Sequence, residues 1–157
     1  METANETILS RWYDEYGTDI LRYCFLFLGN RTDAEDATPD TFLKVWRNIG
    51  RFEARNGCSP KTWIIKIASN TCRDFLRRGW RKHENRQITP EDLKKLGNAP
   101  DESRELIMDV MNLPTKYREV VLLVFMQGMT VRVAADCMQT SASTISRRLE
   151  KAKKMIA

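Results

Sequence analysis

Apolar residues recur every three or four positions along most of this chain, the spacing that places them on one face of an α-helix. In the first segment, Trp12, Tyr16, Ile20, Tyr23 and Phe27 follow this spacing. Alternation with a period of two, bounded by hairpin turns, is not sustained anywhere in the sequence. The pattern therefore predicts an all-α fold.

A second helix is predicted from Asp33 to Ile49. Gly29 and Asn30 tolerate left-handed backbone, so they are suited to ending the first helix. Asp33 is then a suitable N-cap, because its carboxylate accepts from free backbone N–H groups. Gly50 ends the helix, whose apolar face is formed by Phe42, Val45, Trp46 and Ile49.

Pro39 falls inside this predicted helix. An interior proline removes a backbone donor and clashes with the carbonyl four residues earlier, here that of Glu35, at a cost of about 3 kcal/mol. Two arrangements remain open. The helix either begins later, with Thr38 as N-cap and Pro39 at the first helical position, where proline fits, or it continues through Pro39 with a kink.

A third helix is predicted over residues 61–81, after a loop at residues 51–61 that contains Gly57 and Pro60. Its cationic side chains (Lys66, Arg73, Arg77 and Arg78) are left for the outer face. Helical spacing places the following residues inward: Trp63, Ile64, Ile67, Ala68, Thr71 and Phe75.

The apolar period fails over residues 82–101, which are polar and contain two prolines and a Gly-Asn pair. We interpret this segment as a linker with one short helical turn near Pro90–Leu96. The predicted organisation is a helical domain at residues 1–81, the linker at 82–101, and a second helical domain at 102–157.

The second domain is predicted to end in a helix-turn-helix. Leu106, Ile107, Val110 and Met111 mark its first helix, Pro114 fits the first turn of the next, and Gly128 ends that one. Thr130 caps a short helix. After a turn of about three residues, the last helix is capped by Ser141 or Ser143 and runs to about Ile156.

Charge is unevenly distributed along the sequence. Residues 1–50 carry a net charge of −4, residues 51–100 carry +7, and residues 101–157 carry +2. A surface that binds a polyanion is therefore expected after residue 50 and again near the C-terminus, where five cations surround Glu150. The acidic first third must serve another purpose.

Several function classes are disfavoured. No apolar run approaches the roughly 18 residues of a spanning helix, and residues 1–11 lack the order of a secretion signal, so a cytoplasmic protein is expected. The four scattered cysteines and the single His83 do not give the paired ligands of a zinc site. Nucleotide-binding glycine loops and common hydrolase motifs do not occur, so we expect no enzyme, metal or cofactor.

The last helix has the composition of a groove-binding helix. Small polar residues at its start permit close approach to base edges, and the arginines that follow suit phosphate or guanine. The alternative is a solvated basic helix that closes a bundle. Trp63 beside arginines suits stacking on single-stranded bases, although such a tryptophan is more often part of a core.

With these residues in hand, the chain resembles a bacterial sigma factor of the extracytoplasmic-function (ECF) group, which keeps two helical domains called regions 2 and 4. The motif DAEDATPDTFLKVW resembles the region 2 helix that binds the beta-prime clamp of RNA polymerase. The segments SPKTWIIKIASNTCRDFLRR and SASTISRRLEKAKK resemble those that read the minus-ten and minus-thirty-five promoter elements. The resemblance covers nearly the whole chain.

This resemblance implies three sets of site residues. The polymerase-binding set is Asp33, Glu35, Asp36, Asp40, Phe42 and Trp46. The promoter-binding set of region 2 is Phe52, Arg55, Asn56, Trp63, Asn70, Arg73, Asp74, Arg77 and Arg78. The promoter-binding set of region 4 is Ser141, Ser143, Thr144, Arg147, Arg148 and Lys151.

The implied function is that of a promoter-specificity subunit. Its partners would be promoter DNA, core RNA polymerase through the beta-prime clamp and the beta flap, and an anti-sigma factor, with no small-molecule substrate and with association to the nucleoid when active. The alternatives are a stand-alone helix-turn-helix regulator and a protein-interaction bundle with a basic surface.

Three positions depart from the family pattern. Family members commonly have glutamine at Pro39, glutamate at Val133 and glycine at Gln139. Gln139 stands where left-handed backbone is expected, which strains a non-glycine residue. If the second helix continues through Pro39, Pro39→Gln is expected to stabilise the fold and strengthen polymerase binding.

Overall fold

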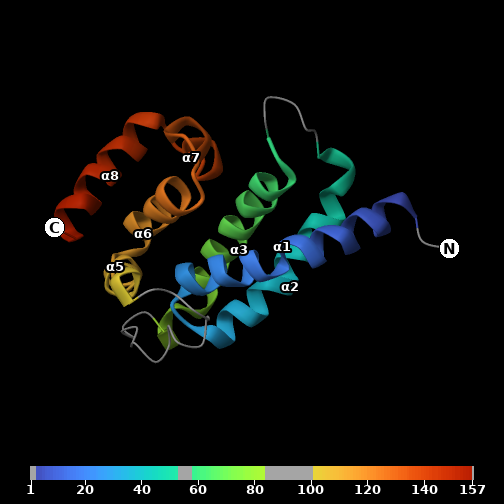
Figure 1. The fold of residues 1–157 in the computed structure, drawn as a ribbon, viewed down its shortest axis with the longest axis horizontal. Coiled ribbons are helices and arrows are strands. Elements are labelled where there is room, and N and C mark those ends of the chain that lie inside the picture. The colour runs from blue at the N-terminus through green and yellow to red at the C-terminus, as the bar shows by residue number, and fades with distance from the viewer. Residues whose placement is uncertain (1–2, 53–57, 84–100, 157) are drawn as a thin grey trace. The chain divides into compact units, whose positions relative to one another are not determined.

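The structure is a computed structural model that describes residues 3–52, 58–83 and 101–156. Every regular element in these ranges is a helix, and the chain divides into two compact units, Met1–Lys82 and His83–Ala157 (Figure 1). The prediction of an all-α fold with two helical domains is confirmed. The predicted helical turn near Pro90–Leu96 lies outside the described residues.

Helix α1 (Ala4–Leu28) is closed at both ends by local chemistry. The Thr3 hydroxyl accepts from the backbone N–H of Glu6 at 3.1 Å, and the Glu6 carboxylate accepts from the backbone N–H of Thr3 at 3.1 Å, forming a capping box. At the other end Gly29 adopts a left-handed φ of 70° and donates to the Phe25 carbonyl. The predicted end of the first helix at Gly29 is therefore confirmed.

Helix α2 (Arg31–Asn48) begins before the predicted start. Its N-cap is Asn30, whose side-chain oxygen accepts from the Asp33 backbone N–H at 2.9 Å. The prediction of Asp33 as the N-cap was wrong, because a better-placed amide precedes it. Asp33 instead lies in the first turn, where a carboxylate favours the helix dipole.

Pro39 lies inside α2, so the predicted late start with Thr38 as N-cap was also wrong. Thr38 is helical, and its hydroxyl donates to the Ala34 carbonyl at 2.8 Å. Packing explains why the helix continues, since Ala34 and Ala37 are fully buried and Pro39 points outward. Burial of this face against α1 outweighs the missing backbone bond at residue 39.

A short 3₁₀ helix, η1 (Ile49–Arg51), follows α2.

Helix α3 (Pro60–His83) begins with Pro60 in its first turn, and the Ser59 hydroxyl accepts from the Thr62 backbone N–H at 3.1 Å. The fully or almost fully buried residues of α3 are Ile64, Ile65, Ala68, Ser69, Thr71 and Cys72. The expected inward positions Trp63, Ile67 and Phe75 are only half-buried, because the core-facing stripe lies about one position further along the helix.

Polar contacts join the helices of the first unit. The hydroxyls of Tyr23 on α1 and Ser69 on α3 are hydrogen-bonded in the core. The Lys61 ammonium on α3 lies 3.3 Å from the Asp19 carboxylate on α1. These contacts fix α3, which carries most of the promoter-binding residues predicted for the first domain, against α1.

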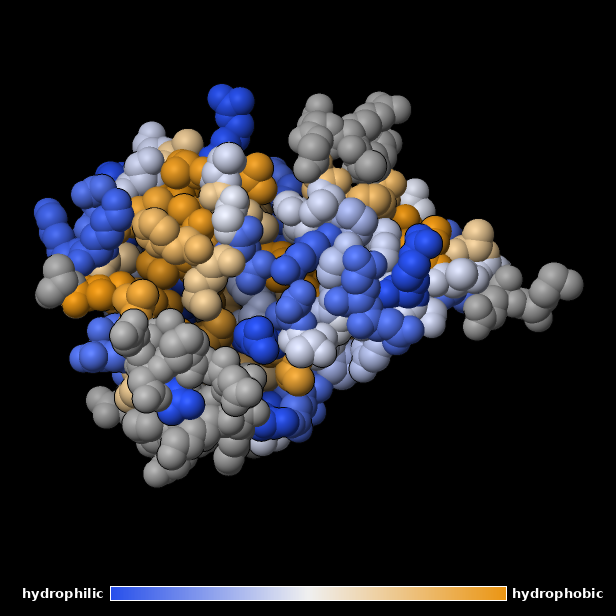
Figure 2. Space-filling model, viewed as in Figure 1, coloured by the Kyte–Doolittle hydropathy of each residue, from blue (hydrophilic) through white to orange (hydrophobic). Residues whose placement is uncertain are grey.

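The second unit contains α5 (Asp101–Met111), α6 (Thr115–Val121), α7 (Val131–Cys137) and α8 (Ala142–Ile156). A π-helical stretch, η3 (Leu122–Met126), continues α6, and Gly128 ends it with a φ of 70°. Pro114 is the N-cap of α6 rather than its first residue, one position from the prediction. Figure 2 shows apolar side chains gathered over the region of α6 and α7 on the viewed face.

Helices α7 and α8 form the predicted helix-turn-helix. The Thr130 hydroxyl caps α7 by accepting from the Val133 N–H at 3.1 Å. Gln139 in the turn has a φ of 55°, as expected for a left-handed position. Ser141, and not Ser143, caps α8, because its hydroxyl accepts from the Thr144 N–H at 3.2 Å.

In the part of the chain that the structure describes, no helix is both long enough and apolar enough to cross a membrane.

Candidate polymerase and nucleic-acid interfaces

The predicted polymerase-binding residues do not share one environment. Glu35, Asp36 and Asp40 are exposed on α2, and Asp33 and Trp46 are half-buried. Phe42 is only 5% exposed and packs edge-on against Tyr13 of α1, with ring centroids 5.0 Å apart. Phe42 therefore supports the surface from below.

An apolar groove of about 500 Å³ lies between α1 and α2 beside these acidic residues. Tyr13 and Leu43 are 54% and 47% exposed, and an exposed apolar surface of this kind is typical of a protein contact. Sequence analysis missed the α1 residues and Leu43, because only the packed helices bring them together. The groove is lined by Glu6, Leu9, Ser10, Tyr13, Pro39, Phe42, Leu43 and Trp46.

Three aromatic rings meet in the first unit, just after η1. The rings of Phe52 and Trp63 have centroids 5.3 Å apart, and Trp12 lies 5.3 Å from Phe52 and 6.1 Å from Trp63. Trp12 is buried, whereas Phe52 and Trp63 are half-buried, so their outer faces remain available for stacking. Predicted partners Arg55 and Asn56 lie outside the described residues.

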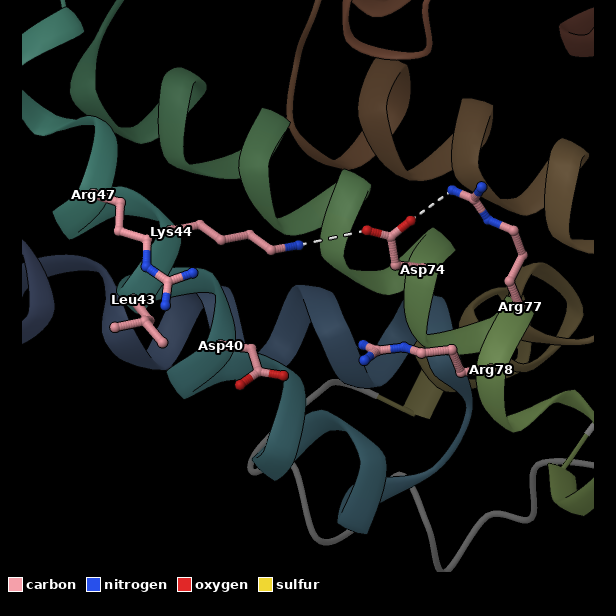
Figure 3. Close-up of a pocket in the computed structure, with 7 residues that line it drawn as sticks. All are labelled: Asp40, Leu43, Lys44, Arg47, Asp74, Arg77 and Arg78. Carbon is pink, nitrogen blue, oxygen red and sulfur yellow. Dashed lines mark hydrogen bonds and ion pairs between the residues drawn. The ribbon is translucent and has the colours of Figure 1, made fainter.

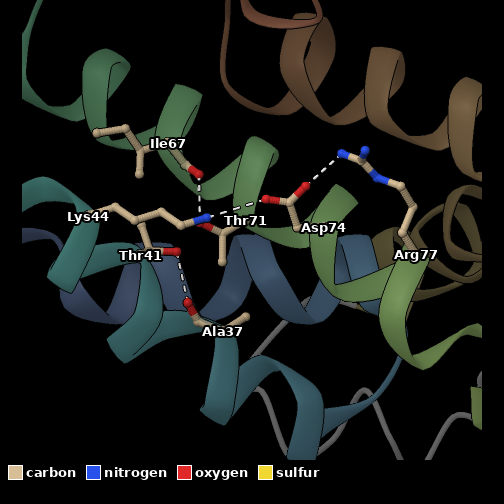
Figure 4. Close-up of polar contacts among 7 residues, drawn as sticks. All are labelled: Ala37, Thr41, Lys44, Ile67, Thr71, Asp74 and Arg77. Carbon is tan, nitrogen blue, oxygen red and sulfur yellow. Dashed lines mark hydrogen bonds and ion pairs between the residues drawn. The ribbon is translucent and has the colours of Figure 1, made fainter.

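On α3, Asn70, Arg77 and Arg78 are exposed, and Arg73 and Asp74 are half-buried. The Asp74 carboxylate accepts from Arg77 Nη2 at 2.6 Å and lies 3.6 Å from Lys44 Nζ of α2 (Figure 4). The Asp74 carboxylate is therefore paired with two cations, Arg77 on α3 and Lys44 on α2.

A cleft of about 530 Å³ lies between α2 and α3 around this ion pair (Figure 3). Lys44 and Arg47 contribute to it from α2, although sequence analysis assigned them no role. Their i, i+3 spacing was the available signal, but it gave no indication of which helix they would face. The cleft is lined by Asp40, Leu43, Lys44, Arg47, Asp74, Arg77 and Arg78.

The start of α8 carries a local hydrogen-bond network. Ser141 Oγ and Thr144 Oγ1 are 2.9 Å apart, and Arg147 Nη2 donates to Thr144 Oγ1 at 3.2 Å. Ser143, Arg147 and Lys151 are exposed, and Arg148 is half-buried. The predicted reading residues thus line the outer side of α8, while Ile145, Leu149 and Ala152 form its buried side.

A smaller pocket of about 230 Å³ joins α8 to α6. It is lined by Lys116, Tyr117, Thr144, Arg147, Arg148 and Lys151, with no carboxylate among these described residues. The ammonium groups of Lys116 and Lys151 lie 5.1 and 5.6 Å from the centre of the Tyr117 ring. A hydrogen bond with Lys151 lowers the pKa of Tyr117, and the charges of both lysines act in the same direction.

Arg118, which follows Tyr117 on α6, is a largely desolvated cation. Burial lowers its pKa to about 10. Its Nη2 donates to Thr115 Oγ1 at 3.4 Å, and its Nε is buried without a hydrogen-bond partner among the described residues.

Cys24, Cys72 and Cys137 are buried and Cys58 is half-buried. Among the described residues, no group of three or more histidine, cysteine or acidic side chains is arranged to hold a metal ion.

An all-helical chain of two units, with a basic helix-turn-helix at the end of the second, defines a class of DNA-binding protein. Residues 12–82 match Sigma-70 region 2, and residues 104–156 match Sigma-70 region 4. The chain therefore belongs to the sigma-70 family of RNA polymerase sigma factors, in the ECF group. The prediction of a sigma factor is confirmed.

Curated relatives agree with this assignment. The ECF RNA polymerase sigma factor BldN of Streptomyces coelicolor is 29% identical over 86% of this chain and 53% of its own length, so the chain spans about half of that relative. The sigma-E factor of Haemophilus influenzae is 24% identical over 98% of this chain and 85% of its own. SigX of Bacillus subtilis is 24% identical over 85% and 73%.

Solved structures share the fold. CnrH in complex with the cytosolic domain of CnrY has a TM-score of 0.68 at 20% identity, over 98% of this chain and 87% of that one. RpoE of Bartonella quintana in complex with the anti-sigma factor NepR has a TM-score of 0.68 at 18% identity, over 94% and 92%.

Proposed function

We propose that this chain directs core RNA polymerase to specific promoters, with the first unit binding polymerase and the minus-ten element and the second binding the minus-thirty-five element. The observation that carries this proposal is the order of surfaces along one chain. An acidic helix beside an apolar groove comes first, a cationic helix beside stacked aromatics follows, and a basic helix-turn-helix ends the chain. A protein partner and two nucleic-acid contacts account for all three.

The polymerase contact uses α2. Its exposed acidic residues Glu35, Asp36 and Asp40 would meet cations of the beta-prime clamp, while the groove around Tyr13 and Trp46 would take an apolar side chain of the partner. Electrostatic complementarity of this kind sets encounter rate and register, and apolar burial supplies most of the affinity. Asp33 and Phe42 act indirectly, since one lies in the first turn and the other packs beneath the surface.

The minus-ten contact uses α3 and the aromatic cluster. Half-buried Phe52 and Trp63 would offer ring faces to unstacked bases, and Asn70, Arg77 and Arg78, exposed along α3, would follow the DNA backbone. Extruding a base costs a few kcal/mol, which base stacking on the rings helps to offset.

The minus-thirty-five contact uses α8 in the major groove. Ser143, near its start, leaves room for close approach, while the exposed Arg147 and Lys151 would reach guanine or phosphate. In the same unit Leu106, Phe125 and Met126 are 56%, 57% and 43% exposed. These apolar side chains support a protein contact of the second unit with the beta flap.

An anti-sigma factor is the regulatory partner that we propose. The two similar structures above are complexes with a CnrY cytosolic domain and with NepR. An inhibitor that covers the acidic and apolar surface of α2 would block the contact proposed for polymerase. The chain itself would catalyse no reaction, would need no cofactor, and would act in the cytoplasm at the nucleoid.

Reconstituted transcription tests this function. Core polymerase is combined with the purified chain on fragments of the source genome, and transcript starts are sequenced. We expect new starts that share two upstream elements, and Arg147→Ala should reduce them. The absence of any chain-dependent transcript would contradict the proposal. Tight binding of the chain alone to two-fold symmetric sites would instead support a stand-alone regulator.

A further inference from the structure

We propose that the cleft between α2 and α3 binds a phosphate of the promoter DNA backbone, with Arg47 of α2 and Arg78 of α3 as its ligands. This inference rests on the proposed function and adds α2 to the DNA-binding surface. Sequence analysis and family resemblance assigned α2 to polymerase alone.

The charge of the cleft favours an anion. Four cations and two carboxylates line it, which leaves a net charge of +2. Asp74 lies within 3.6 Å of Lys44 and 2.6 Å of Arg77, so its negative charge is already shared between two cations. Arg47 and Arg78 are exposed, and Asp40 is the remaining carboxylate among the lining residues.

The cleft is open to a ligand as large as a nucleic acid. Arg47, Arg77 and Arg78 are exposed, and the Lys44 and Asp74 side chains keep 33% and 38% of their surface. Figure 3 shows the Arg78 side chain reaching from α3 toward α2, which carries Arg47. Exposed ion pairs of this type are worth at most about 1 kcal/mol, so an incoming phosphate can compete for Lys44 and Arg77.

The faces of α2 explain how one helix can serve two partners. Asp40, Lys44 and Arg47 follow the i, i+4, i+7 spacing of a single helical stripe and line the cleft. Pro39 and Trp46 lie on the adjacent stripe and line the apolar groove. Polymerase bound at the groove and at Asp40 would leave Lys44 and Arg47 available to the cleft and to the DNA that α3 contacts.

DNA is a better occupant than a small anion because the cleft continues the cationic surface of α3. Arg77 and Arg78 belong both to the cleft and to the exposed side of that helix. A backbone that follows α3 would therefore pass the mouth of the cleft. Every nucleotide carries the same phosphate, so a phosphate contact there would add affinity without adding sequence preference.

Salt dependence of promoter binding by the holoenzyme tests this inference. The probe is a promoter fragment identified from the transcript starts, and the variants are Arg47→Ala and the control Arg22→Ala, which removes an exposed arginine of α1 outside the cleft. For Arg47→Ala we expect up to about fivefold weaker binding. Losing one phosphate contact should also flatten the slope of log K against log salt by about 0.7–0.9.

Affinity for core polymerase, measured separately without DNA, decides between the two partners of α2. Unchanged core affinity together with a flatter salt slope supports the phosphate site, and Arg47→Lys should restore most of the slope. A slope equal to that of the parent, or a loss of core affinity with unchanged DNA binding, would overturn the inference. Failure of the proposed function is recognised separately, because the parent chain would then give no promoter-dependent transcript.

Discussion

The ammonium of Lys44 on α2 lies 3.6 Å from the carboxylate of Asp74 on α3, and this ion pair joins the helix proposed for polymerase to the helix proposed for DNA. Asp74 also accepts from Arg77 at 2.6 Å. A carboxylate held between two cations repels phosphate less than a free one, and it fixes where those cations lie. We therefore regard Asp74 as a positioning residue for Lys44 and Arg77.

The Lys44–Asp74 pair should contribute little to stability. Because about a third of each side chain is exposed, solvent screens the attraction, and we expect a coupling energy below about 1 kcal/mol. The measurement is a double-mutant cycle with Lys44→Ala and Asp74→Ala, followed by urea unfolding of each variant. A coupling above about 2 kcal/mol would show that the pair is a main clamp between α2 and α3.

Replacing Pro39 should stabilise the first unit. Pro39 lies inside α2, so a residue with an N–H there would supply a donor to the Glu35 carbonyl and remove a steric clash, worth about 3 kcal/mol. Loss of the rigid ring also enlarges the unfolded ensemble, which offsets up to about 1 kcal/mol. The net gain of about 2 kcal/mol corresponds to a rise in Tm of roughly 10 °C, measured by circular dichroism for Pro39→Gln.

Pro39→Ala is the matched variant, because alanine also restores the N–H but lacks the longer side chain. Similar gains in both variants would assign the effect to the backbone. An unchanged Tm in both would mean that the structure around Pro39 already compensates for the missing bond. Core-polymerase affinity of both variants would then show whether the ring itself contributes to the apolar groove.

Local signals in the sequence predicted much of this fold. The helix ends at Gly29, Gly128 and Thr130 follow from the chemistry of single residues, so no distant contact was needed to find them, and Ser141 was one of two caps predicted for α8. The start of α2 could not be found this way. Asn30, Asp33 and Thr38 all suit an N-cap by residue type. Burial of Ala34 and Ala37 against α1 excludes the start at Thr38, and Asn30 supplies the observed cap by accepting from the Asp33 N–H.

The candidate site was only partly predictable for the same reason. Residues of one helical stripe, such as Arg147 and Lys151, could be assigned from spacing alone. The groove beside Tyr13 and the cleft beside Lys44 each require two helices to meet, and spacing does not say which faces pack. Phe42 also shows that a residue within a binding motif can lie beneath the surface that the motif forms.

Tyr117 should ionise at a lower pH than Tyr16. Hydrogen bonding with Lys151 lowers the pKa of Tyr117 from 10.0, whereas partial burial and then Glu15 raise that of Tyr16. Ultraviolet difference titration of the parent against Tyr117→Phe isolates the first phenol. Since the folded state loses this proton before the unfolded state does, stability gained from Tyr117 should rise with pH up to about 10 and disappear as pH falls.

Lys151→Gln is the informative control for this titration. Removing the ammonium should return the pKa of Tyr117 toward its ordinary value, because the hydrogen bond with Lys151 is the largest cause of the shift. Lys153→Gln, which removes a nearby cation on the same helix outside the pocket, should leave the titration in place. Equal effects of both variants would point to net charge as the cause.

Replacing Gln139 should stabilise the second unit. Its φ of 55° is left-handed, a conformation that costs a residue with a Cβ about 1–2 kcal/mol and costs glycine almost nothing. Gln139→Gly also loosens the unfolded chain, which offsets about 0.4–1 kcal/mol, so we expect a net gain of about 0.5–1 kcal/mol. Urea unfolding gives this value directly, and Gln139→Ala should give no gain, because alanine keeps the strain. A glycine variant no more stable than the alanine variant would show that the turn between α7 and α8 holds Gln139 without strain.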